Sequence, residues 1–152
     1  MQRYFTGLTE GEGCFNISFN FKTRLKLGIE VRPSFSLTLN QRDLELIKKV
    51  HEFFGCGSIR FYKQDRCYKY ETRCLSDIHK KIIYHFDRFP LLGSKQKDYL
   101  IFRSIVLHMR ENGHKNPEIL RNIISQAYMM NPSGKRKYDK EELLSKLDEN
   151  KV

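Results

Sequence analysis

A glutamate flanked by two glycines near the start of the chain is the first candidate for chemistry. Residues 5–13 read Phe-Thr-Gly-Leu-Thr-Glu-Gly-Glu-Gly, and this pattern predicts a helix that ends at Glu12 and Gly13. An acid at the C-terminal end of a helix is unfavourable in the field of the helix dipole, and a cation such as a bound metal ion compensates it. Glu12 is therefore a candidate metal ligand. The structural alternative is an ordinary helix stop with a solvated Glu12.

The same helix carries two glycines four residues apart, Gly7 and Gly11, on one face. Glycine costs about 1 kcal/mol relative to alanine inside a helix, so the spacing favours close packing against another backbone. Gly7, Leu8 and Gly11 are therefore the expected contact face for a partner helix.

The composition points to a polyanionic partner. The chain has 152 residues, with 28 Lys and Arg against 18 Asp and Glu, which gives a net charge of +10. This excess favours nucleic acid first and an anionic membrane second. No apolar run is long enough for a membrane span, and no secretory signal is visible, so we expect a soluble intracellular protein. The four cysteines form no C-x-x-C pair and are expected to be reduced thiols.

Two alternating segments follow the motif and predict strands with one apolar and one polar face. The first places Phe15, Ile17, Phe19 and Phe21 against polar residues, and the second does the same from Ile29 to Leu39. A basic hairpin loop joins them at residues 23–28. Short polar side chains with Arg and Lys are the types that read base edges in a major groove. A merely solvated sheet face is the alternative.

The remaining pattern predicts helices at residues 42–54, 78–86, 97–111, 117–129 and 139–147, and strands at 58–62 and 68–75. We expect Asn40 or Asp43 to cap the first of these helices and Asp77 the second. The order predicts an α+β fold of αββαββα layout, with an antiparallel sheet covered by helices on one face. A single domain over residues 1–152 is expected, with a core at 1–130 and a C-terminal basic turn and helix at 131–152.

These residues carry a resemblance to a known family. Residues 5–13 resemble the signature motif of the LAGLIDADG homing endonucleases, in which the eighth position is an acid and the third and seventh are usually small. The strand from Phe15, the helix and glycine turn at 43–57, the stretch at 85–97 and the basic turn at 131–138 resemble further parts of the family. The resemblance extends over nearly the whole chain.

The resemblance implies a saddle-shaped sheet over the DNA major groove and site-specific cleavage of both strands of a long pseudo-palindromic duplex. A single motif implies a homodimer packed through the motif helices. Glu12 from each subunit, with the carbonyl of Gly11 as an adjacent ligand, would hold Mg²⁺, for which Mn²⁺ or Ca²⁺ could substitute in binding. Lys95 and Gln41 occupy the places of the catalytic basic and polar residues, with Asn40 and Arg42 as alternatives to Gln41. Glu10 is expected to be structural.

The resemblance also implies the DNA contacts. On the strands and loops these are Asn16, Ser18, Asn20, Lys22, Arg24, Lys26, Arg32, Ser34, Ser36, Thr38, Arg60, Tyr62, Lys69, Glu71 and Arg73. Lys97 and the turn of Lys135, Arg136 and Lys137 are expected to clamp phosphates.

Two other functions stay open. Some members of the family are maturases that bind intron RNA and assist splicing, and a catalytically silent DNA-binding module is the third reading. The intact set of Glu12, Gln41 and Lys95 favours the nuclease. Family members are typically encoded by organelle introns or archaeal genes, so we expect a mitochondrial or chloroplast location.

Overall fold

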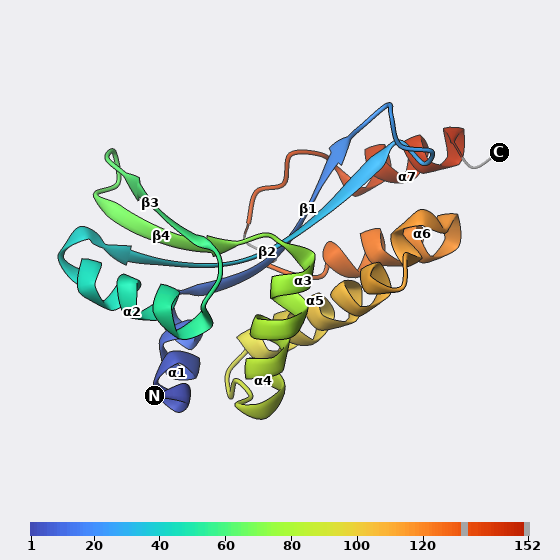
Figure 1. Cartoon of the computed structure of the whole chain (residues 1–152). Helices are drawn as coiled ribbons and strands as arrows, with labels where there is room; N and C mark the ends of the chain where they lie inside the picture. The colour runs from blue at the N-terminus through green and yellow to red at the C-terminus, as the bar shows by residue number, and fades with distance from the viewer. Residues whose placement is uncertain (132–133, 151–152) are drawn as a thin grey trace. The chain divides into compact units, whose positions relative to one another are not determined.

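The computed structural model describes residues 1–131 and 134–150 (Figure 1). Pro132 and Ser133 of the expected basic turn, and Lys151 and Val152, lie outside the described residues. The elements are, in chain order, α1 (Gln2–Glu12), β1 (Gly13–Phe21), β2 (Ile29–Asn40), η1 (Gln41–Asp43), α2 (Leu44–Phe54), β3 (Ser58–Tyr62), β4 (Cys67–Thr72), α3 (Leu75–Asp77), the π-helical η2 (Ile78–Ile83), α4 (Tyr84–Arg88), α5 (Lys95–Arg110), η3 (Gly113–Lys115), α6 (Pro117–Ala127) and α7 (Lys140–Glu149). The predicted αββαββα order is confirmed.

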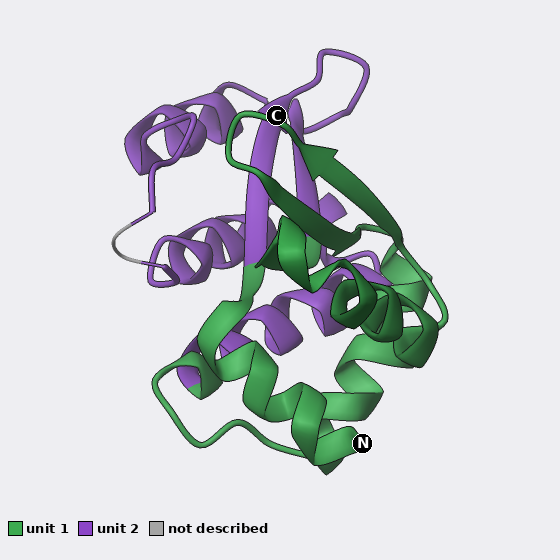
Figure 2. Ribbon diagram, turned by 90° about the vertical axis from the view of Figure 1, so that its left-hand side faces the viewer, with its two compact units in different colours: residues 1–15, 34–96 green, residues 16–33, 97–152 purple. Residues whose placement is uncertain are grey.

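The four strands form one sheet in the order β1-β2-β4-β3, in which β4 pairs antiparallel with both β2 and β3. The chain groups into two compact units, residues 1–15 with 34–96 and residues 16–33 with 97–152 (Figure 2). Strands β1 and β2 contribute residues to both units, and each unit is described separately below. The single domain expected from the sequence stays a prediction.

Aromatic side chains build the core of the first unit. Helix α2 packs against β4 and β3, and α1, α2 and α4 lie on one side of these strands (Figure 1). Phe35 of β2 is fully buried, with ring centroids 5.7 Å from Phe54 of α2, 5.6 Å from Phe86 of α4 and 6.3 Å from Tyr70 of β4. Successive side chains of a strand point to opposite faces of the sheet. The apolar side chains therefore face the helices, and the polar side chains lie on the opposite face of the sheet.

Aliphatic side chains build the core of the second unit. Helix α6 packs against α7 and η3. Its Leu120, Ile123 and Ile124 are fully buried, as are Leu143 and Leu147 of α7. Asn116 caps α6 by accepting hydrogen bonds from the backbone N–H groups of Glu118 and Ile119 at 2.9 and 3.1 Å, and Pro117 occupies the first turn, where no N–H partner is needed.

Two expected helix starts differ from the structure, and one of the two caps expected before α2 is present. The helix expected to begin at Ile78 begins at Leu75, and Asp77 lies inside it rather than capping it. Asn40 caps the short η1 by accepting from the Arg42 N–H, whereas Asp43 makes no side-chain cap. Helix α5 begins at Lys95, two residues before the expected start, so Lys95 belongs to a helix instead of a loop.

The cysteines and the acidic side chains are dispersed over the described residues. The four cysteines are free, as predicted. Within residues 1–131 and 134–150, no three His, Cys, Asp or Glu side chains gather closely enough to hold a metal ion. None of the helices in that part of the chain is long and apolar enough to cross a membrane.

Candidate active site and nucleic-acid interface

Glu12 is the last residue of α1 and its side chain is exposed. Among residues 1–131 and 134–150 its carboxylate has no hydrogen bond and no cation within ion-pair distance. Helix carbonyls of the last turn also lack partners inside the helix, so the C-terminal end of α1 presents oxygen ligands. Glu12 and the exposed Gly11 therefore lie where a hard cation would find a carboxylate and backbone carbonyls.

Lys95 sits directly behind this helix end. Its Nζ donates to the carbonyl of Thr9 at 3.0 Å and to that of Gly13 at 2.5 Å. A lysine at a helix C-terminus is favourable in the helix dipole, so Lys95 supplies the cation that the end of α1 requires. Because its donors are directed at backbone carbonyls, the Glu12 carboxylate stays unpaired.

Gly13 permits the close turn from α1 into β1. A Cβ built at this position would lie 2.4 Å from the Thr9 Cγ2 atom and 2.9 Å from the Thr9 carbonyl oxygen, so a side chain does not fit. The glycine after Glu12 is thus required by a close approach, which keeps Gly13 and Thr9 near enough to share the Lys95 ammonium.

Glu10 anchors the loop that precedes Lys95. Its Oε1 accepts hydrogen bonds from the backbone N–H groups of Leu92 and, at 3.0 Å, Gly93. A Cβ at Gly93 would lie 2.8 Å from the other carboxylate oxygen of Glu10, so the Glu10 side chain would have to shift to admit it. The structural role predicted for Glu10 is confirmed. The contact holds the loop against α1 and sets where α5, and hence Lys95, begins.

A buried histidine fixes the other half of α1. The hydroxyl of Thr6 donates to the Phe89 carbonyl at 3.1 Å, and Nε2 of His85 lies 3.0 Å from the same hydroxyl oxygen. Since the hydroxyl has a single proton, Nε2 of His85 donates to Thr6. Burial lowers the pKa of His85 to about 4, so the ring is neutral. No local sequence pattern indicates this contact, because its two sides are far apart in the chain.

Gln41 is the first residue of η1, directly after β2, and is exposed. Its backbone N–H donates to the Arg66 carbonyl at 2.8 Å, and its side chain has no hydrogen-bond partner in the described part of the chain. The two alternatives are both engaged elsewhere: Asn40 caps η1, and Arg42 lies 3.7 Å from Asp43. Of the three, Gln41 keeps a free polar group, although no contact joins it to Glu12 or Lys95 among residues 1–131 and 134–150.

The glycine face of α1 is open. Gly7 and Gly11 are exposed, and a Cβ at either position would meet no atom within 4 Å, while Leu8 is half-buried. Phe5, Thr6 and Thr9 are the buried residues, on other positions of the same helix. The face carrying Gly7 and Gly11 therefore has room for a second helix.

The polar face of the first unit is defined by strand register. Ser36 lies opposite Glu71 and Thr38 opposite Lys69, and Arg60 of β3 also lies opposite Lys69. Lys69 and Arg73 approach Glu71 at 3.1 and 3.0 Å. Two more of the expected contacts, Ser34 and Tyr62, lie in this unit. Ser34 is buried, as is Ser36, and Tyr62 is exposed at the end of β3.

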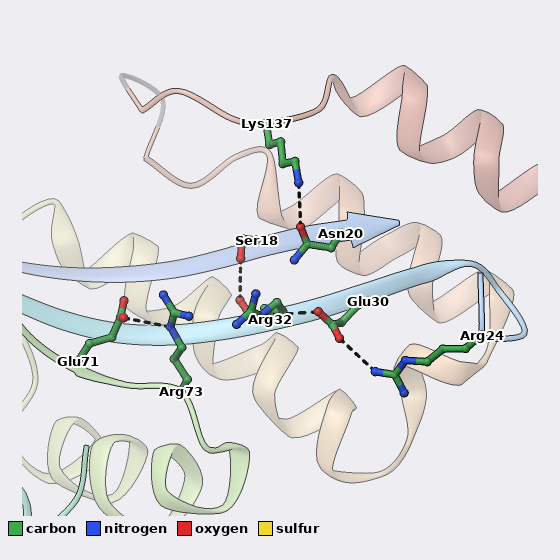
Figure 3. Close-up of polar contacts among 8 residues, drawn as sticks. All are labelled: Ser18, Asn20, Arg24, Glu30, Arg32, Glu71, Arg73 and Lys137. Atoms are coloured by element: carbon green, nitrogen blue, oxygen red, sulfur yellow. Dashed lines mark hydrogen bonds and ion pairs between the residues drawn. The ribbon is translucent and has the colours of Figure 1, made fainter. Parts of the chain in front are cut away.

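The polar face of the second unit carries a similar network (Figure 3). Glu30 of β2 lies 3.7 Å from both Arg24 of the hairpin loop and Arg32. On β1, the Ser18 hydroxyl donates to the Arg32 carbonyl at 3.4 Å. Asn16, Ser18 and Asn20 alternate with buried Ile17 and Phe19, and Lys22 and Lys26 lie between the end of β1 and the start of β2. Lys97 is exposed in the first turn of α5.

The C-terminal basic turn divides into two kinds of side chain. Arg136 is half-buried, donates to the carbonyls of Ile17 and Ala127 at 2.5 Å each, and lies over the Tyr128 ring at 4.6 Å. It thereby covers an edge strand and a helix end inside the unit. Lys135 and Lys137 are exposed, and Lys137 donates to Asn20. A shallow pocket lined by Asn16, Ser18 and these basic residues lies between the strand and the turn.

The motif at residues 5–13, which includes Glu12, and Lys95 all lie within the residues that match one protein-family model. The family model described as LAGLIDADG endonuclease matches residues 5–106. The chain belongs to the LAGLIDADG endonuclease family. A probable intron-encoded DNA endonuclease of Mycosarcoma maydis is 30% identical over 145 residues, which cover 95% of this chain and 52% of that protein. A probable intron-encoded endonuclease, Cox1-I1b, of Schizosaccharomyces pombe is 32% identical over 110 residues, or 72% of this chain and 28% of that protein.

Solved structures of the LAGLIDADG family share the fold. The homing endonuclease I-TnaI superposes with a TM-score of 0.85 at 30% identity, over 99% of this chain and 97% of that one. I-SmaMI bound to an uncleaved DNA target in the presence of calcium ions gives a TM-score of 0.84 at 29% identity, over 86% of this chain and 45% of that one. The chain spans about a quarter to a half of the length of several curated relatives, at 24%, 52% and 28%.

Proposed function

We propose that this chain is a homing endonuclease that cleaves both strands of a long, specific DNA duplex by metal-dependent phosphodiester hydrolysis. The observation that carries the proposal is the exposed, unpaired Glu12 at the end of α1, with Lys95 seated on the carbonyls behind it. Family membership and the DNA target bound by the similar I-SmaMI support a nucleic-acid substrate.

Mg²⁺ is the proposed cofactor, held by the Glu12 carboxylate and the Gly11 carbonyl. Both groups are hard oxygen ligands, and the calcium ions present with DNA-bound I-SmaMI support a site of this chemistry. When bound, the metal would activate water and stabilise the leaving oxygen of an in-line displacement. Lys95 holds the end of α1 in place and adds positive charge beside the substrate phosphate. Gln41, with a free amide, would position water.

The polar sheet faces are the proposed DNA-reading surface, and the exposed lysines the proposed phosphate contacts. On β1, Asn16, Ser18 and Asn20 alternate with buried residues, whereas Ser34 and Ser36 of β2 are themselves buried. Ion pairs with Glu30 hold Arg24 and Arg32 in the second unit, and ion pairs with Glu71 hold Lys69 and Arg73 in the first. Short polar side chains donate to and accept from base edges, and arginine and lysine also donate to guanine, whereas contacts to phosphates carry no sequence information. Lys97, Lys135 and Lys137 are exposed and remain proposed phosphate contacts, whereas Arg136 is engaged inside its unit.

The decisive experiment replaces Glu12 by Gln, which keeps the shape and removes the charge. With Mg²⁺ and a target selected from a randomised duplex pool, we expect cleavage to fall by about a hundred- to a thousandfold, the range seen when a transition-state-stabilising group is lost. Binding of the selected duplex should persist within about threefold, because Glu12 lies off the strands that supply the base contacts.

Glu52→Gln is the matched control, because Glu52 is an exposed acid of α2 with no function proposed. It should leave cleavage unchanged. Cleavage by the Glu12 variant at the wild-type rate would overturn the proposed mechanism. A wild-type chain that never cuts DNA but promotes splicing of an intron RNA would establish the maturase function instead.

We propose that the site is completed by a second copy of the chain, packed through the face of α1 that carries Gly7 and Gly11. One copy offers a single unpaired acid, and no cluster of three ligating side chains occurs among the residues described. Two copies related by a two-fold axis would bring two Glu12 side chains together and would match a two-fold DNA site.

Gly7→Leu tests the proposed packing. In the single chain a Cβ atom at this position meets nothing within 4 Å, and replacing a helical glycine favours the helix by about 0.5–1 kcal/mol. We therefore expect a monomer of unchanged or higher stability whose self-association, measured by sedimentation, is at least about tenfold weaker, or 1.4 kcal/mol. Lys49→Leu, at an exposed position of α2, should not change association. A wild-type monomer at micromolar concentration that still cuts both strands would refute the dimer.

The gene location is also a proposal. The relatives from Mycosarcoma maydis and Schizosaccharomyces pombe bear names that place them in introns, the latter in cox1. We propose an organelle intron as the source of this chain. Sequencing the DNA that flanks the gene would test it, since a nuclear position outside any intron would contradict it.

A further inference from the structure

Asn20, one of the proposed base-reading residues, is held by a lysine from the C-terminal turn. The Nζ atom of Lys137 lies 3.3 Å from Oδ1 of Asn20 (Figure 3). Both residues belong to the second unit, and Asn20 is the last polar position of β1 before Phe21. The contact joins parts of the chain 117 residues apart in sequence.

The lysine is itself kept beside Asn20 by packing. Tyr138, the next residue, has its ring centroid 4.3 Å from that of Phe21, and the Lys137 ammonium lies 5.2 Å from the Tyr138 ring centroid. Arg136, on the other side, donates to the carbonyls of Ile17 and Ala127. The residues before and after Lys137 therefore attach the turn to β1, so the position of the lysine is fixed by more than its single hydrogen bond.

The chemistry of the contact determines which way the amide faces. An ammonium group has three donors and no acceptor, so the Asn20 atom that meets it is the oxygen. The amide nitrogen, with its two N–H donors, is then the part of the side chain left for another partner. An asparagine without such a neighbour can offer either its donor or its acceptor, and often offers both to the same adenine.

We propose that Lys137 is a positioning residue that makes Asn20 a hydrogen-bond donor to DNA, and that this fixes the class of base it accepts. The inference rests on the proposed function, because it requires β1 to read a major groove. Guanine offers the N7 and O6 acceptors, thymine O4 and adenine N7, whereas cytosine offers only an amino donor. The base facing Asn20 should therefore be guanine first and cytosine last.

Ser18, the next polar position on the same strand, provides an internal contrast. Its hydroxyl lies 3.4 Å from the Arg32 carbonyl, a long hydrogen bond, and a hydroxyl proton rotates freely between partners. Ser18 can thus donate to one base and accept from another. No donor lysine fixes it in the described structure, so its preference should be broad.

The test is selection of bound duplexes from a randomised pool with the wild-type chain and three variants. Asn20→Ala identifies the base position that Asn20 reads, because preference there disappears. At that position, cytosine should be rare among the duplexes bound by the wild type. In the duplexes bound by Lys137→Ala, the frequencies of cytosine and adenine relative to guanine should rise by about fivefold. Lys137→Arg keeps a donor at this place and should retain the wild-type preference.

Lys135→Ala is the matched control, since Lys135 is an exposed cation of the same turn. It should weaken binding to all sequences about equally and reduce the salt dependence. If Lys137→Ala behaves in the same way, with the base preference unchanged, Lys137 is only a phosphate contact and the inference is wrong. The thermal unfolding midpoint of each variant is also measured. A midpoint equal to that of the wild type shows that a changed base preference does not come from unfolding. Failure of the wild type to enrich any duplex would contradict the proposed function, and this inference with it.

Discussion

Glu12 of α1 and the glutamates of the strands have opposite surroundings. Glu30 on β2 has two arginines at 3.7 Å, and Glu71 on β4 has a lysine and an arginine at 3.1 and 3.0 Å. Glu12 at the end of α1 has no cation within ion-pair distance among the described residues, although Lys95 binds the carbonyls of the same helix end. A glutamate that pairs with two cations holds their side chains in place. A glutamate that makes no ion pair keeps its negative charge for an external cation.

The difference follows from charge and geometry. Each strand glutamate leaves one net positive charge on its group of three, so the proposed reading face stays attractive to phosphates while its long side chains are held in defined positions. At the end of α1 the helix dipole makes a negative charge unfavourable. A chain that tolerates Glu12 there, and directs Lys95 to backbone carbonyls of the same helix end, retains a ligand for an external cation.

Lys95→Met gives the largest expected effect in this comparison. The change removes two charge-assisted hydrogen bonds and leaves the Gly13 carbonyl without this donor, in a partly buried place. We expect the free energy of unfolding to fall by about 2 kcal/mol, measured as a lower denaturant midpoint at unchanged slope. Cleavage should fall as well, because the end of α1 positions Glu12.

Lys97→Met is the control for this change, since Lys97 is exposed two residues later in α5. Its effect on stability should stay within about 0.5 kcal/mol. Equal losses for the two variants would show that Lys95 does not hold the end of α1, and would remove the structural basis for an unpaired Glu12.

Strand β1 was predictable from sequence because one local rule fixes it. Phe15, Ile17 and Phe19 alternate with polar residues, and the structure has β1 at Gly13–Phe21 with that same alternation of burial. The end of α1 was predictable for the same reason, since Gly11 and Gly13 weaken a helix locally. Glu12 was a candidate metal ligand from its position at a helix C-terminus, and the family motif supported that inference. Its lack of a partner, in contrast, became visible only in the structure.

The contacts that place the site were not predictable, because they join distant parts of the chain. Lys95 was expected in a loop, but the hydrogen bonds of Glu10 to Leu92 and Gly93 fix that loop and allow α5 to begin at Lys95. Arg136 was expected on DNA, yet its guanidinium binds two backbone carbonyls within its own unit. Neither the charge of a residue nor its spacing in the sequence indicates that its side chain will bind backbone carbonyls of its own chain.

The smallest expected effect sets the two kinds of glutamate directly against each other. Glu12→Gln removes an unfavourable charge from a helix C-terminus, so without metal and at low salt it should raise the free energy of unfolding by about 0.3–1 kcal/mol. Glu30→Gln removes the acid shared by two exposed arginines and should lower it by about 0.2–1 kcal/mol. Both changes are measured by denaturant titration in the same buffer, and the difference should shrink as salt is added. A loss of stability in both variants would mean that Glu12 has a partner in solution, and the comparison on which its assignment as a metal ligand rests would fail.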